Sequence, residues 1–193
     1  MEKISYALGL SIGNNLLSSG IAQLDLEKFC QAVADVLGHK TPEMSYDEAK
    51  EVLNRFFADL SRQVAEKQQA SGRAFLEKNA KEQGVVVLPS GLQYKVLSEG
   101  SGRKPGPTDK VRCHYEGSLI DGTVFDSSVK RGEPAEFGVN QVIAGWVEAL
   151  QLMSEGAKWR LFIPSELAYG AQGAGASVPP HATLVLMLNS LKS

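Results

Sequence analysis

Cysteine and histidine are scarce in this chain, and the few that occur are not arranged to bind a metal. Its 193 residues include two cysteines, Cys30 and Cys113, and three histidines. The cysteines lie far apart, and neither His114 nor His181 has a carboxylate or cysteine at ligand spacing. We therefore expect no metal and no cofactor. We also expect two buried free thiols rather than a disulfide, which is typical of a reducing compartment.

An excess of positive charge and long apolar runs are missing too. The chain has 20 basic and 22 acidic residues, a formal net charge of −2, so we expect no nucleic-acid partner, which would need surplus positive charge. No segment approaches the roughly 20 apolar residues of a membrane helix, and the N-terminus lacks the pattern of a signal peptide. We expect no membrane association and a cytoplasmic location, or a periplasmic one if a signal peptide has been removed.

Motifs for nucleophilic catalysis or phosphoryl transfer do not occur in the sequence. It contains no G-x-S-x-G elbow, no glycine-rich phosphate loop and no H-E-x-x-H. Hydrolysis by an activated nucleophile is therefore not indicated.

Glycine and proline are scarce only in the first part of the chain. Residues 1–83 hold five of the 19 glycines and one of the eight prolines, and residues 84–193 hold the rest. Because these residues mark turns and strand ends, the first part is predicted to be helical and the second β-rich. We predict a helical module over 1–44, a long spacer helix over 45–83 and a β domain over 84–193.

Three helical patterns occupy the first part. One apolar stripe recurs every four residues, at Ile4, Leu8, Ile12 and Leu16. Asp25 is suited to cap a second helix that ends near Gly38, and Ser45-x-x-Glu48 is typical of a capping box. The third helix then meets no clear stop before Gly84 and runs for about 37 residues, and its polar second half is typical of a solvated spacer.

The apolar stripes of the first two helices have little to pack on within so small a module. Burial against a second copy is the simplest solution, so we predict a homodimer through the N-terminal helices. The alternative is that these helices fold back onto the β domain.

The second part alternates between apolar and polar residues, as half-buried strands do. The alternating positions are Val111, Cys113 and Tyr115 in one strand and Trp159, Leu161 and Ile163 in another. Asp121-Gly122 indicates a tight hairpin, and Leu184–Leu188 is apolar on both faces, as in a central strand covered on both sides. With a short helix predicted over Gln141–Leu150, the fold class is α+β: a curved antiparallel sheet wrapped on one short helix.

Aromatic side chains in turn-rich segments are the chemistry this domain offers. They are Tyr115, Phe125, Phe137, Trp146 and Tyr169. For any one of them, membership of the core is an equally good explanation. The ordinary role of Asp126 is to cap the turn that follows it, and that of Arg131 is a solvated loop charge.

Five segments together resemble the FKBP-type prolyl isomerases, the tacrolimus-binding immunophilins. The matching runs are Val111–Gly117, Asp121–Ser128, Val142–Trp146, Ala168–Gly170 and Val178–Val185. Their order and spacing match the family across residues 84–193. The N-terminal part, with Lys3–Gly9 and the long third helix, resembles the dimeric macrophage-infectivity-potentiator subgroup.

The resemblance implies a peptidyl-prolyl cis/trans isomerase with an apolar pocket. Its implied catalytic residues are Tyr115, Phe125, Asp126, Trp146 and Tyr169. Its implied substrate- or inhibitor-binding residues are Arg131, Phe137, Val142, Ile143, Ala168, Val178 and Leu186. Trp146 is implied to form the floor, Asp126 and Tyr169 to make polar contacts, and the Ile143 N–H to meet a ligand carbonyl. Arg131 is implied to pair with Asp126.

The same resemblance implies partners. They are proline-containing polypeptides as substrates and tacrolimus- or rapamycin-type macrolides as inhibitors. Four positions depart from the best-known members, namely Ala135, Ala174, Ser177 and Leu186, and we expect a wider, less aromatic pocket as a result.

Two other functions compete with catalysis at this point. One is a non-catalytic module that grips a peptide or a fixed partner in an FKBP-like pocket. The other is a structural helical dimer with a passive β cap. As a further hypothesis, the N-terminal arm binds polypeptide as a chaperone.

Overall fold

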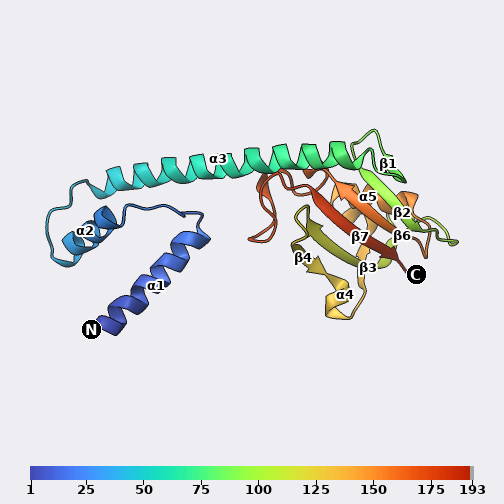
Figure 1. Ribbon diagram of the computed structural model, residues 1–193. Coiled ribbons are helices and arrows are strands. Elements are labelled where there is room, and N and C mark those ends of the chain that lie inside the picture. The colour runs from blue at the N-terminus through green and yellow to red at the C-terminus, as the bar shows by residue number, and fades with distance from the viewer. Residues whose placement is uncertain (192–193) are drawn as a thin grey trace. The chain divides into compact units, whose positions relative to one another are not determined.

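The computed structural model describes residues 1–191. Contacts between backbone positions divide the chain into two compact units, Met1–Ser61 and Arg62–Ser193 (Figure 1). The division falls inside the long helix α3, Tyr46–Asn79. Among the described residues, no helix combines the length and the apolar character needed to cross a bilayer.

The first unit contains α1 (Glu2–Ser18), α2 (Leu26–Leu37) and the start of α3. The predicted cap of α2 is confirmed: the Lys28 N–H donates to the Asp25 carboxylate at 3.0 Å, and Gly38 follows the last residue of α2. Of the capping box predicted for α3, the structure shows the bond from the Glu48 N–H to the Ser45 Oγ, at 3.2 Å.

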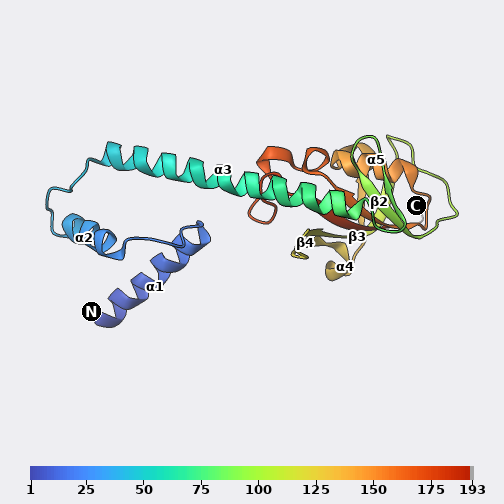
Figure 2. The same cartoon turned by 45° about the horizontal axis from the view of Figure 1, so that its top comes forward.

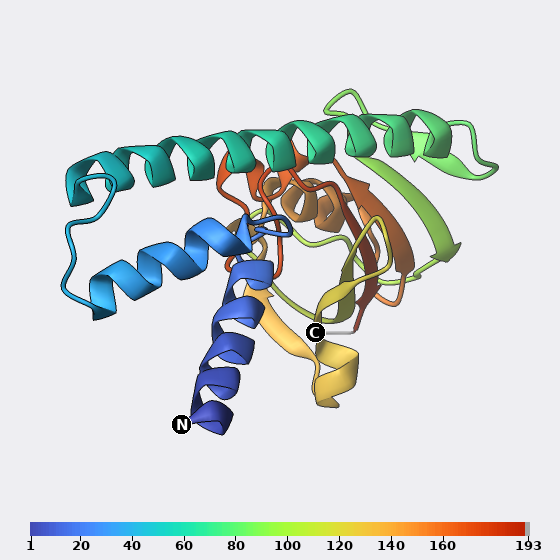
Figure 3. The same ribbon diagram turned by 60° about the vertical axis from the view of Figure 1, so that its left-hand side comes forward.

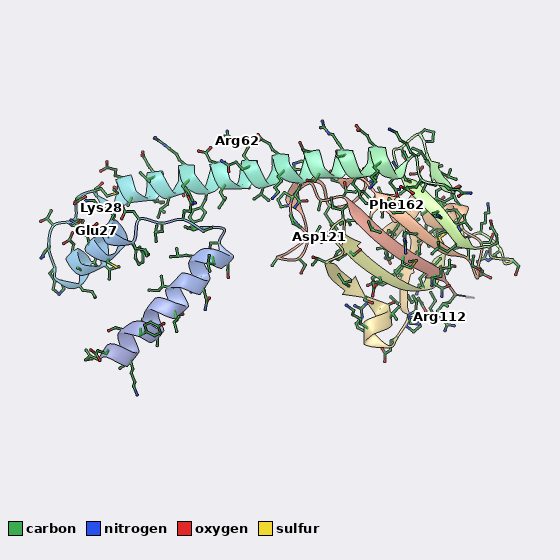
Figure 4. The ribbon with its side chains drawn as sticks, in the orientation of Figure 1. Glu27, Lys28, Arg62, Arg112, Asp121 and Phe162 are labelled. Atoms are coloured by element: carbon green, nitrogen blue, oxygen red, sulfur yellow. The ribbon has the colours of Figure 1, made fainter. Side chains whose placement is uncertain are left out.

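One ion pair ties α2 to the segment that leads into α3. The Lys28 Nζ lies 2.9 Å from a Glu43 carboxylate oxygen, and Figure 4 labels Lys28 and its neighbour Glu27 on α2. Both side chains of the pair are more than half exposed, so it adds little stability.

The apolar stripes of this unit find no cover within one chain. Neither α1 nor α2 has a buried residue, and Ile4, Leu8 and Leu17 are 62%, 59% and 63% exposed. The expectation of two buried thiols is wrong for Cys30, which is exposed on α2, and correct for Cys113, which is buried in β3. Cys30 is exposed because the apolar face of α2, which it shares with Leu26 and Leu37, is itself uncovered.

The second unit is built on one antiparallel sheet. Its strands are β1 (Val85–Val87), β2 (Gln93–Ser98), β3 (Lys110–Leu119), β4 (Val124–Ser127), β5 (Ala135–Gly138), β6 (Lys158–Ile163) and β7 (Leu184–Ser190). Across residues 1–191 they form a seven-stranded sheet in the order β1-β2-β6-β7-β3-β4, with β5 paired to β3. The fold class predicted from the sequence is therefore confirmed.

Burial in the sheet follows the predicted alternation. In β3, Val111 and Cys113 are buried between exposed Lys110 and Arg112, and Asp121 marks the turn into β4 (Figure 4). The central strand β7 differs from the prediction in one respect, because its positions alternate between buried and half-buried rather than being covered equally on both faces.

A short helix, α5 (Ala144–Leu152), packs on the buried face of the sheet (Figure 3). It contributes Trp146, Ala149 and Leu150 to the core. It begins three residues later than predicted, because residues 139–141 form a separate 3₁₀ turn, η1 (Val139–Gln141).

The last turns of α3 belong to this second unit. Gly72 and Asn79 are buried, and the Phe75 ring lies 6.0 Å from that of Phe162 on β6 (Figure 4). The helix ends at Asn79, short of the predicted stop at Gly84. The predicted spacer is thus not solvated along its whole length.

Candidate active site

A cavity of about 300 Å³ opens beside α5. Its lining comes from β3, β4, β5, α5, β7 and the loops around them. The lining residues are Tyr115, Phe125, Asp126, Phe137, Gln141, Val142, Ile143, Trp146, Tyr169, Leu184 and Leu186. Apolar and aromatic side chains dominate this list, and a cavity of this size suits one small peptide unit.

Three aromatic rings meet at one wall of the cavity. The Trp146 ring centroid lies 5.1 Å from that of Tyr115, nearly perpendicular at 74°, and 5.1 Å from that of Phe137. Trp146 is buried, and its Nε1 has no hydrogen-bond partner among the described residues. The edge-to-face arrangement of Trp146 and Tyr115 is one of the favoured geometries for aromatic pairs.

The Phe125 ring reaches the cavity because β3 carries a glycine beneath it. Gly117 pairs with Asp126 across β3 and β4, and a Cβ at Gly117 would lie 2.5 Å from the Phe125 Cζ. Any larger residue would push the ring away. A glycine inside a strand is a sequence signal of such close approach, but this one was not used in the prediction.

Asp126 is bound at both of its carboxylate oxygens. The Tyr115 hydroxyl donates to Oδ2 at 2.5 Å, and the Arg131 guanidinium pairs with Oδ1. Arg131 also donates to the Tyr115 hydroxyl at 2.9 Å, and its Cζ lies 5.6 Å from the centre of that ring. The pair between Arg131 and Asp126 is the one that the resemblance implied.

The local backbone brings Arg131 back toward Asp126. Ser127 caps the short helix α4 (Ser128–Arg131) by accepting the Lys130 N–H at 3.2 Å. The capping role considered for Asp126 therefore belongs to Ser127, which leaves the Asp126 carboxylate for the network.

These contacts shift the pKa values of the network. Burial alone would raise the pKa of the Asp126 carboxyl, but the Tyr115 hydrogen bond and the Arg131 pair outweigh burial, and this pKa lies below its ordinary value. Burial, with the bond to Asp126, raises the pKa of the Tyr115 hydroxyl. At neutral pH the network therefore consists of a carboxylate, a neutral phenol and a guanidinium.

Three of the predicted site residues do not line the cavity. Arg131 lies behind Asp126 and reaches the site through it. Val178 is buried and bridges to Ala174 in the loop before β7, and Ala168 packs against the core. Val178 and Ala168 therefore belong to the core beside the cavity rather than to its wall.

The cavity also includes two residues that the prediction missed. Leu184 is the first residue of β7, and its position at the strand end brings it to the cavity. Gln141 closes η1, and its Oε1 accepts the Gly138 N–H at 3.2 Å. Gln141 follows another polar residue, Asn140, and no periodic signal could have identified it as a cavity residue.

Comparisons with known proteins bear on both parts of the chain. A family model for FKBP-type peptidyl-prolyl cis-trans isomerases matches residues 101–189, and a model for the domain amino terminal to such isomerases matches residues 1–96.

Curated proteins are similar over nearly the whole chain. The FKBP-type 22 kDa peptidyl-prolyl cis-trans isomerase of Escherichia coli K12 is 50% identical, with 97% of this chain and 93% of the relative covered. The outer membrane protein MIP of Legionella longbeachae is 42% identical, covering 97% of this chain and 83% of its own. The name of this second relative does not support the cytoplasmic location expected from the sequence.

A solved structure is similar as well. The crystal structure of FkpA from Escherichia coli aligns with a TM-score of 0.81 at 36% identity, over 98% of this chain and 94% of the other.

Proposed function

The chain belongs to the family of FKBP-type peptidyl-prolyl cis/trans isomerases, and from that premise we propose how its cavity accelerates X–Pro isomerisation in folding polypeptides. The observation that carries the proposal is the cavity itself, an apolar space walled by Trp146, Tyr115, Phe125 and Phe137. Its one carboxylate, Asp126, is already committed to Tyr115 and Arg131.

Such a cavity can favour the twisted imide over the planar one. Rotation about a peptide bond has a barrier of about 18–20 kcal/mol, because the planar form is stabilised by resonance, and X–Pro bonds exchange in about 10–100 s. The twisted form is less polar, so water favours the planar form and a dry pocket removes that advantage. A reduction of the barrier by about 4 kcal/mol gives roughly a thousandfold acceleration.

We propose that some residues of the cavity form its apolar surface and that others position the substrate. Trp146 and Phe125 form the apolar surface on which the proline ring packs. Asp126 keeps the Tyr115 ring in place and takes no part in proton transfer, since both of its oxygens are bound. The Tyr169 hydroxyl and the Ile143 N–H, which lies at the N-cap of α5, then hold the carbonyls beside the twisted bond.

The test is a protease-coupled assay on an Ala-Pro peptide with the intact chain. We expect the wild type to accelerate isomerisation and Phe125→Ala to lower kcat/KM by about 10- to 100-fold, or 1.4–2.7 kcal/mol of transition-state stabilisation. Val129→Ala is the matched control, because Val129 is exposed on neighbouring α4. A wild-type rate equal to buffer would favour the non-catalytic binding module, and full activity in Phe125→Ala would favour a passive cap.

For the N-terminal unit we propose a homodimer that binds unfolded polypeptide and presents it to the cavity. The support is the large exposed apolar surface of α1 and α2. Two sites held in one dimer raise the effective concentration of a long substrate. Macrolides of the tacrolimus or rapamycin type are proposed inhibitors, and of the two locations considered, the name of the Legionella relative favours the periplasmic one.

A further inference from the structure

One loop lies between two residues that line the cavity, and a backbone hydrogen bond joins its two ends, here called its base. Residues 170–183, here called the rim loop, connect Tyr169 to Leu184, and both of these residues line the cavity. The His181 N–H donates to the Gly170 carbonyl at 2.8 Å, so the two ends of the rim loop meet directly beside Tyr169. A displacement of this base changes the relative positions of the two cavity residues.

The rim loop is also tied to itself. Ala174 and Val178 exchange two backbone hydrogen bonds, at 2.9 and 3.1 Å. Gly173, directly before Ala174, has a φ of +64°, and a Cβ there would lie 2.3 Å from the Val178 carbonyl oxygen. The rim loop therefore has backbone hydrogen bonds both at its base and within it.

The last turns of α3 contact that base. The Gln69 Nε2 lies 3.0 Å from the His181 Nδ1, where it can donate to the imidazole nitrogen. Three residues on, Gly72 lies so close to Thr183 that a Cβ at Gly72 would be 2.3 Å from the Thr183 Oγ1. Figures 1 and 2 both show the orange-red segment that leads to β7 alongside α3.

A second set of contacts fixes the same face of α3 to the sheet. Gln69, Gly72, Leu76 and Asn79 are spaced three, four and three residues apart and so share one helix face. The Asn79 Nδ2 donates to the Gln93 Oε1 at 2.8 Å, and the Gln93 Nε2 donates to the Leu76 carbonyl at 2.9 Å. The last turns of α3 thus bind β2 through Asn79 and contact the base of the rim loop through Gln69.

We infer that Gln69 and Gly72 are positioning residues for the isomerase site, acting through His181 and Thr183 on the rim loop and hence on Tyr169. The inference rests on the proposed isomerase function and adds that α3 is part of the scaffold of the cavity. A shift of about 1 Å in a substrate-contacting group can cost up to about 100-fold in rate. A change in the contacts at the base of the rim loop is therefore expected to alter the rate.

Gly72→Ala tests the inference, because it inserts one methyl group between α3 and the base of the rim loop. Alanine favours a helix more than glycine does, so a loss of activity cannot be attributed to a weaker helix. In the intact chain we expect kcat/KM on an Ala-Pro peptide to fall at least about fivefold, mainly through kcat.

Thr183→Ala removes the clashing oxygen, and the double variant should return to within about twofold of Thr183→Ala alone. Ser71→Ala, at an exposed position of the same helix, should match the wild type.

The outcomes separate this inference from the function on which it rests. A wild type without activity refutes the proposed function. An active wild type with Gly72→Ala within twofold of it, or a double variant no better than Gly72→Ala, overturns the inference.

If Gly72→Ala does not fold, Gln69→Ala removes the bond to His181 without adding an atom. It should lower kcat/KM about threefold and shift the amide NMR signals of Tyr169 and Gly170. Unchanged rates with unchanged signals overturn the inference.

Discussion

At the scale of single residues, the network around Asp126 links the pH of the solution to the stability of the cavity wall. Its pKa in the folded chain is lowered, against the effect of burial, by Tyr115 and Arg131. A group whose folded pKa is depressed stabilises the protein above its unfolded pKa, and that stability is lost as the pH falls through the folded value. The network should therefore be intact at neutral pH and fail only in acid.

Asp126→Asn measures this contribution. At pH 7 we expect the variant to be less stable than the wild type by about 1 kcal/mol or less, because the pair with Arg131 is 40–52% exposed and screened. The difference should shrink as the pH falls below the ordinary pKa of an aspartate, about 3.9. Urea unfolding between pH 7 and pH 3 measures it, with the exposed Glu133→Gln as control. A difference that is constant over this range would contradict the network.

The two cysteines differ in burial and should differ in reactivity. Burial raises the pKa of the Cys113 thiol to about 12, so only about one molecule in ten thousand carries its thiolate at pH 8. A Cys30→Ser chain should therefore show no thiol reactive toward a disulfide reagent until it is unfolded in denaturant, when one thiol per chain appears. Fast reaction of the folded Cys30→Ser chain would show that the β3 interior opens.

At the scale of elements, the signals that succeeded were local ones. The cap at Asp25 and the alternation in β3 each depend on a few neighbouring residues, so the start of α2 and the faces of β3 could be predicted from the sequence. Strand β5 has only four residues, too few for alternation to be recognised. The 3₁₀ turn η1 similarly shifted the start of α5.

The docking of α3 escaped prediction for a different physical reason. A search for helix faces looks for apolar periodicity, whereas this face makes its contacts with Gln69, Gly72 and Asn79. A helix face made of polar side chains and a glycine is predicted to be solvated, because its partners on the sheet are not evident from the sequence. Long-range hydrogen bonds leave no trace in a local pattern, and a glycine such as Gly72 can mark a close approach without showing which residue approaches it.

The cavity shows the same division between local and long-range information. Any single aromatic residue could equally have belonged to the core, and only the resemblance of five segments identified these as site residues. Leu184 and Gln141 were missed because the path of the loops, rather than a motif, brings them to the wall. Ala168 and Val178 were included because they belong to matching segments, although their side chains face elsewhere.

At the scale of the whole molecule, the exposed face of α1 is the feature that a single chain does not explain. Leu10 and Leu17 are 55% and 63% exposed, and both line a hollow of about 600 Å³ on the first unit. Covering such a face removes apolar area from water at about 25 cal/mol per Å², and a second copy supplies an identical apolar face. A dimer therefore explains an exposure that monomers rarely tolerate.

Leu10→Glu tests the dimer and the role of the arm together. A charge at this position is solvated in a single chain but buried and unpaired in a dimer, which is costly. We expect the wild type to sediment at twice 20.8 kDa and the variant at 20.8 kDa, with Ser11→Glu, at an exposed polar position of the same helix, behaving as the wild type. Because the cavity lies in the other unit, Leu10→Glu should keep the wild-type rate on a short Ala-Pro peptide. Its rate in the proline-limited refolding of a protein should fall at least about tenfold, because two linked sites act together on such a substrate.

A wild type that sediments as a single chain refutes the dimer, and equal losses on both substrates refute the role of the arm.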